Sequence, residues 1–116
     1  MRYALLALAL TVTPAHATEK RCGYLANPTP GNWWLTDRDR TWDIGTQGGY
    51  QARGMDRMPD MTTRGWVKTN GHYGYGCACM TVIADRKRGR IARILAARPV
   101  PMRQCKMDPK LEDPAH

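Results

Sequence analysis

The chain of 116 residues contains no phenylalanine and no serine. The absence of serine excludes a nucleophile elbow of the Gly-x-Ser-x-Gly type. The absence of phenylalanine leaves the aromatic part of the core to tryptophan and tyrosine, whose N–H and O–H groups need partners when they are buried. Eight such residues follow position 17: Trp33, Trp34, Trp42, Trp66, Tyr24, Tyr50, Tyr73 and Tyr75.

Long apolar runs are also absent, except for one at the start of the chain. Arg2 supplies a positive charge, residues 3–12 are almost continuously apolar, and Ala15 and Ala17 place small residues where a signal peptidase cuts. The run is shorter than the roughly 20 residues that a transmembrane helix needs, and Arg21 before Cys22 disfavours a lipoprotein. We therefore predict a signal peptide at 1–17, cleaved near Ala17, and one secreted or periplasmic domain at 18–116.

The predicted mature domain has 99 residues and four cysteines, and a core of this size is marginal without cross-links. An oxidising compartment permits disulfides. Side chains alternate along a strand, so Cys77 and Cys79 point to the same face and are poorly placed to bond each other. We expect each to pair with Cys22 or Cys105, and the sequence leaves both pairings open. A zinc site is disfavoured by the Cys-x-Cys spacing and by the leader.

Short alternating patterns separated by polar turns predict a mainly β fold, a small disulfide-linked antiparallel sheet or sandwich with little helix. Asn70-Gly71 is a strong signal for a tight hairpin turn, and residues 51–63 are typical of a loop. One alternative is an amphipathic helix over residues 86–98. The predicted strands are Asn32–Thr36, Thr41–Thr46, Trp66–Thr69, His72–Ala84 and Arg90–Ala96.

The sequence after the leader is basic, with 17 Lys and Arg against 10 Asp and Glu. Residues 86–103 contain no acid, which suits phosphates, anionic lipid or lipopolysaccharide, or an acidic protein; the alternative is a solvated hairpin edge whose charges prevent aggregation. Nucleic acid fits the predicted compartment poorly. The candidate binding surface combines Trp33, Trp34, Tyr73 and Tyr75 with Arg86, Lys87, Arg88 and Arg90.

Metal ligation has one candidate, the run Met55, Met58 and Met61, which His72 could join, because thioethers suit monovalent copper. Methionines that fill gaps in the core are the competing interpretation. A calcium loop over residues 37–43 is less favourable than a simple turn, in which Asp37 accepts hydrogen bonds from turn amides. We expect no cofactor.

Catalysis finds little support, because His72 is the only histidine of the mature domain apart from the terminal His116, and the cysteines pair with one another. We therefore predict a non-enzymatic binding module that engages a macromolecular envelope partner, as an inhibitor or immunity-like protein does. The alternatives are a copper-handling protein and a binder of anionic lipid or lipopolysaccharide. The sequence predicts neither the partner nor the oligomeric state.

Several segments of the sequence resemble those of one bacterial family. They are Cys22-Gly23-Tyr24, NPTPGNWWLTDRDRTW at 27–42, GTQGG at 45–49, WVKTNGHYGYGCACM at 66–80, and the segment 104–109. The chain resembles the family catalogued as domain of unknown function 4087, which consists of short, secreted, single-domain proteins of Gram-negative bacteria. The resemblance implies the secreted location and the single domain, and it brings no catalytic or binding residues.

Overall fold

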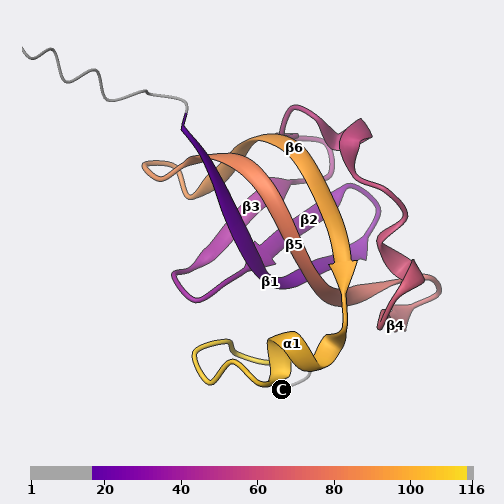
Figure 1. Ribbon diagram of the computed structural model, residues 1–116. Helices are drawn as coiled ribbons and strands as arrows, with labels where there is room; N and C mark the ends of the chain where they lie inside the picture. The colour runs from indigo at the N-terminus through magenta and orange to yellow at the C-terminus, as the bar shows by residue number, and fades with distance from the viewer. Residues whose placement is uncertain (1–16, 115–116) are drawn as a thin grey trace, which may run out of the picture.

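The computed structural model describes residues 17–114, so the predicted signal peptide lies outside the described residues apart from Ala17. Within this part of the chain there are six strands, two short 3₁₀ turns and one short helix (Figure 1). In order they are β1 (Thr18–Thr29), β2 (Asn32–Thr36), β3 (Thr41–Gly45), η1 (Met55–Arg57), η2 (Met61–Thr63), β4 (Val67–Asn70), β5 (Tyr73–Asp85), β6 (Arg90–Val100) and α1 (Met102–Lys106). The prediction of a mainly β fold is confirmed.

The strands form one mixed sheet, and five of them close into a ring. β1 pairs with β2 on one side and with β5 on the other. β2 continues to β3, β3 meets β6 through a parallel contact at Asp43 and Arg90, and β6 returns to β5 as a hairpin. β4 pairs with the first residues of β5. This strand order, with its single parallel contact, has the connectivity of a small OB-type Greek-key barrel, in which closure leaves few exposed edges.

The interior of the barrel holds the main hydrophobic core. The alternation of side chains along β5 sends Met80 and Val82 inward, where they meet Trp42 of β3 and Ile91 and Ile94 of β6. All five side chains are fully buried. Burying apolar area of this kind stabilises the fold by about 25 cal/mol per Å². Trp42 supplies the large aromatic side chain of this core, in a chain that has no phenylalanine.

A second cluster covers the outer face of β1 and β5, where α1 and the C-terminal segment pack (Figure 1). The other set of alternating β5 side chains, including Cys77 and Cys79, points into it. Cys22 lies directly opposite Cys79 in the β1–β5 register and is bonded to it, and Cys77 is bonded to Cys105 of α1. The prediction that both chain ends are tied to one central strand is confirmed, and the structure assigns the pairing.

Two sequence expectations for β6 are wrong. The alternative of a helix over residues 86–98 fails because this segment is a turn followed by a strand paired with β5. The strand also runs through Pro99 to Val100, beyond the predicted end at Ala96. Among residues 17–114, the other edge of β6 pairs only at Arg90, with β3, and at Arg93, with Arg53, so the edge at Pro99 is open, and an open edge tolerates the missing amide hydrogen.

The predicted hairpin at residues 66–84 is confirmed, but its turn lies one residue further on than the sequence suggested. Asn70 pairs with Tyr73, so Gly71 and His72 are the two central residues. Gly71 has a φ of 62°, whereas no residue other than glycine has a positive φ in the described chain. A positive φ at the first central position alone matches a type II′ turn, which requires glycine there.

Strand β1 was not predicted, because its sequence TEKRCGYLANPT lacks a clear alternation and carries glycine and proline. β1 has strand partners on both sides, and residues 21–27 are buried except for Cys22. A strand enclosed on both faces has little need of alternating polarity, so the period-2 signal is missing.

Candidate functional site

Two of the cationic side chains in the basic turn between β5 and β6 form ion pairs with acids of the chain. Asp85 accepts a hydrogen bond from the Arg88 amide at 3.1 Å and one from the Arg88 guanidinium at 2.9 Å. Arg86 reaches Glu19 of β1 at 3.3 Å. Lys87 is exposed and has no polar partner among residues 17–114. The turn therefore resembles a braced hairpin more closely than an open cationic patch.

Arg90, the last member of the predicted basic group, is stacked instead of free. Its guanidinium lies 4.0 Å from the ring centroid of Tyr50, and the Tyr50 hydroxyl donates a 2.6 Å hydrogen bond to the backbone oxygen of Ile91. Burial raises the pKa of Tyr50 above its ordinary value, against the opposing effect of Arg90. The pair fastens the loop after β3 to the start of β6.

The four aromatic residues of the candidate surface do not form one patch with this turn. Tyr73 begins β5 and the turn follows its end, so the two groups lie at opposite ends of a 13-residue strand. Tyr75 is buried in the outer cluster, and Trp33 packs against the barrel core. Only Trp34 is substantially open, at 37% exposure.

The methionine run belongs to the segment between β3 and β4, and its side chains pack against the barrel core. Met61 is buried in the core, and Met55 and Met58 pack against it. His72 is exposed in the β4–β5 turn, with its ring 4.5 Å from that of Tyr73. These positions are those of gap-filling side chains, and residues 17–114 contain no group of three or more His, Cys, Asp or Glu arranged to hold a metal ion.

A buried polar cluster, which we call the Arg21 cluster, joins β1 to the β2–β3 turn. Arg21 and Asp37 are both 7% exposed and lie 2.7 Å apart. Asp37 also accepts hydrogen bonds from the Trp42 indole at 3.0 Å and from the backbone amides of Asp39 and Arg40 at 2.9 and 3.0 Å. The prediction that Asp37 accepts turn amides is confirmed, and its carboxylate is occupied by these contacts.

Arg21 is held by two further acids, Glu19 and Asp39. Burial alone would lower its pKa, but the hydrogen bonds that Arg21 donates to the three carboxylates outweigh this effect and raise it. The Arg21 hydrogen bond lowers the pKa of the Asp39 carboxyl. The guanidinium also lies 4.3 Å over the Trp42 ring. Every member of the Arg21 cluster is thus matched, as expected for a structural network.

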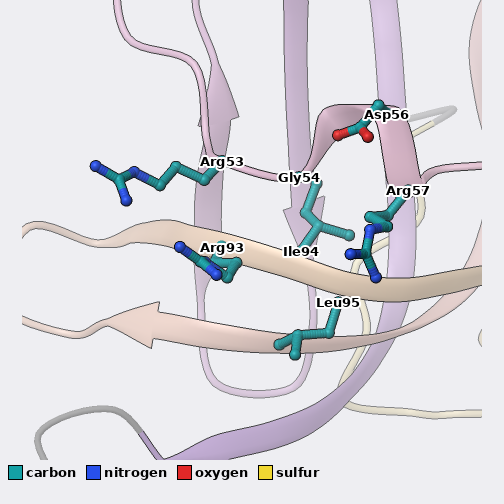
Figure 2. A pocket seen from close by; sticks show the side chains of 7 residues that line it. All are labelled: Arg53, Gly54, Asp56, Arg57, Arg93, Ile94 and Leu95. Atoms are coloured by element: carbon teal, nitrogen blue, oxygen red, sulfur yellow. The ribbon is translucent and has the colours of Figure 1, made fainter.

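A different group of arginines surrounds a shallow pocket of about 270 Å³ between η1 and β6 (Figure 2). We call it the arginine pocket. It is lined by Arg53, Gly54, Asp56, Arg57, Arg93, Ile94 and Leu95. In Figure 2, Arg53 and Arg93 extend in the same direction, and Arg57 lies on the other side of Gly54.

Backbone pairing positions two of these arginines. Arg53 and Arg93 are partners in a parallel bridge, in which the Arg53 amide donates to the Ala92 oxygen at 3.1 Å and the Ile94 amide donates to the Arg53 oxygen at 2.8 Å. Gly54 permits this approach, because its φ is 85° and a Cβ there would overlap the Ile94 carbonyl. The backbone positions of two arginines are therefore fixed next to each other.

The arginines of this pocket form no ion pair within the described chain. Across residues 17–114, no hydrogen bond or ion pair engages the guanidinium of Arg53, Arg57 or Arg93. Asp56 lines the pocket without pairing with any of them. Like charges held side by side on paired strands are unfavourable, so the pocket is a place where an anion would be stabilised.

No local pattern in the sequence indicates this pocket. Arg93 belongs to the acid-free stretch 86–103, and Arg53 and Arg57 lie within residues 51–63, which are typical of a loop. The bridge between Arg53 and Arg93 joins residues 40 positions apart, which no periodicity reveals.

None of the helices in the described part of the chain is long and apolar enough to span a bilayer.

Fold and cross-links together define a small, two-disulfide β-barrel domain. A family model described as "Protein of unknown function (DUF4087)" matches residues 16–112. The chain belongs to this family, and the resemblance seen in the sequence is confirmed. No curated protein and no solved structure matches the chain.

Proposed function

We propose that the protein is a non-enzymatic binding module of the cell envelope that engages an anionic envelope component through the arginine pocket. The observation that carries the proposal is that three arginines without an acidic partner line one pocket. Arg21, Arg38, Arg86 and Arg88 each lie within 3.3 Å of an acid of the chain itself. The three arginines of the pocket have no such partner among residues 17–114, which is also true of Arg64, Arg98 and Arg103, but these do not line the pocket. An unmatched cationic site of this kind attracts a negatively charged partner.

The location is part of the proposal. The leader at 1–17 has the three-part pattern of a secretory signal, and two disulfides are compatible with an oxidising compartment. Cleavage near Ala17 would deliver the domain to the periplasm or the exterior.

A binding role is better supported than catalysis. All four cysteines are bonded, and His72 lies in an exposed turn with Tyr73 as its ring neighbour. Nucleophilic catalysis needs a nucleophile within hydrogen-bond reach of a base that a third group orients, and the residues from 17 to 114 contain no such arrangement around His72.

The test is affinity capture from envelope extract with the mature, disulfide-bonded protein. A charge-neutral variant, R53Q/R57Q/R93Q, is compared with the wild type, and R98Q serves as a control because Arg98 is exposed on β6 outside the pocket. We expect one component to be retained by the wild type and R98Q, lost by the triple variant, and released as salt shortens the screening length to a few ångströms.

Equal capture by the triple variant, or no capture even at low salt, would refute the proposal. If the captured component is an acidic protein, the binding function is that of an inhibitor or immunity-like protein.

A further inference from the structure

The arginine pocket has a chemical character more specific than positive charge. Guanidinium groups bind carboxylates and phosphates through paired, parallel hydrogen bonds, and each presents five N–H donors in a rigid fork. Arg53 and Arg93 present two such forks that extend in the same direction, and Arg57 lies on the other side of Gly54 (Figure 2). The number of donors and charges therefore exceeds what one carboxylate, with a single charge and two oxygens, can match.

We propose that this pocket binds a phosphate monoester group. Such a group carries about 1.5 to 2 negative charges at neutral pH and three strong acceptor oxygens, which matches the charge and the donors of the neighbouring pair Arg53 and Arg93 better than a carboxylate does. The inference rests on the proposed function, because it specifies which group of an anionic component the pocket recognises.

The rest of the lining suits the organic part of such an ester. Leu95 is 36% exposed and forms an apolar wall. Asp56 contributes a carboxylate that repels a second anion but accepts hydrogen bonds from a hydroxyl group. At about 270 Å³ the pocket is slightly smaller than the usual range for drug-sized ligands. Its size and lining therefore fit a phosphorylated glycerol or sugar.

The pocket is held in place by the backbone rather than by the side chains that line it. The bridge between Arg53 and Arg93 and the close approach of Gly54 to Ile94 fix the origins of the two paired arginines. The segment is also anchored by the core contacts of Met55 and Met58. Neutral substitutions of the exposed arginines should therefore leave the fold intact, which makes the site testable.

The first experiment titrates the mature, disulfide-bonded protein with three soluble probes and follows backbone amide shifts by NMR. Methyl phosphate is the monoester, dimethyl phosphate is the matching diester with one charge, and acetate is the carboxylate, all at equal ionic strength. We expect saturable shifts at Gly54 and Ile94, with methyl phosphate binding at least about tenfold more tightly than the other two, the effect of about one additional charged hydrogen bond.

The variants separate the site from general charge. R53Q, R57Q and R93Q should each weaken methyl phosphate binding about tenfold or more, while R98Q, which removes the same charge from the same strand as R93Q, should leave it nearly unchanged. Equal affinity for the three probes, linear shifts without saturation, or an equal loss in R98Q would overturn the inference.

A second arm distinguishes the two sources of a phosphate monoester. Co-flotation with vesicles containing phosphatidic acid, but not with vesicles of equal charge containing phosphatidylglycerol, would assign a lipid headgroup. Binding of glucose 1-phosphate without co-flotation would assign a soluble ester. In both cases R93Q should abolish the interaction.

Failure of this inference can be told from failure of the proposed function. If envelope capture depends on the pocket but methyl phosphate does not bind, the phosphate assignment is wrong and the binding role remains. If methyl phosphate binds and nothing is captured from the envelope, the assignment remains and the macromolecular role is wrong.

Discussion

Replacing Asp37 by alanine tests whether the Arg21 cluster stabilises the fold. The change leaves the buried Trp42 indole without an acceptor, which costs about 1–3 kcal/mol. It also removes a charged hydrogen bond to Arg21, worth about 1.5–3 kcal/mol, although Arg21 keeps two other acids. The freed amides of Asp39 and Arg40 can turn to water, because both residues are exposed. We expect a net loss of about 3 kcal/mol.

Urea unfolding followed by tryptophan fluorescence measures this loss, with far-UV circular dichroism to check that both probes give one transition. In a domain of this size, 3 kcal/mol lowers Tm by about 12 °C or more. The control is Asp39→Ala, which removes another carboxylate from the same arginine but one whose side chain is 64% exposed; its effect should be much smaller. A loss below about 1 kcal/mol for Asp37→Ala, or equal losses in the two variants, would refute the reasoning.

Three further predictions follow. Hydrogen bonds from Arg88 hold the pKa of Asp85 below its ordinary value of 3.8, so its stabilising contribution is complete above that value and is lost as pH falls through the folded-state pKa; Asp85→Asn should flatten acid unfolding curves below about pH 4, and an unchanged slope would contradict this. Gly54→Ala should cost about 2 kcal/mol or more, because it combines a positive φ with a clash against the Ile94 carbonyl; chemical denaturation measures it, and a neutral effect would mean that the bridge to β6 is dispensable. Replacing both members of the disulfide at Cys105 by alanine should cost about 3–4 kcal/mol for a separation of 28 residues, and a smaller loss would indicate that packing of α1 alone closes the outer cluster.

The sequence predicted the elements that have a local signature. The strand prediction was correct for β2 and within a few residues for β3, β5 and β6, and Asn70-Gly71 indicated the hairpin. The same-face argument for Cys77 and Cys79 gave the correct partners as a set, because alternation along a strand is a local rule. The pairing itself depends on the β1–β5 register, and β1 has no alternation by which to recognise it.

Functional side chains were harder to predict, because the relevant property is which charges remain unpaired after folding. In the sequence, the residues from Arg86 to Arg90 stand out by density alone. Folding brings Glu19 and Asp85 to that turn and stacks Arg90 on Tyr50. Charge density along the chain therefore identified the turn in which most of the charges are matched.

The arginine pocket holds charges that the fold itself does not require. The chain contains ten acidic residues, and one of them, Asp56, already lines the pocket but pairs with none of its arginines. Folding needs the bridge between Arg53 and Arg93, but not the charges at its two ends, since a bridge is a backbone contact that most residues can make. The two cations repel each other in the free protein, so the fold would be more stable with neutral side chains there. If R53Q/R93Q unfolds at a higher urea concentration than the wild type in the absence of phosphate, and this order is reversed when methyl phosphate is added, the pocket has given up stability to bind an anion.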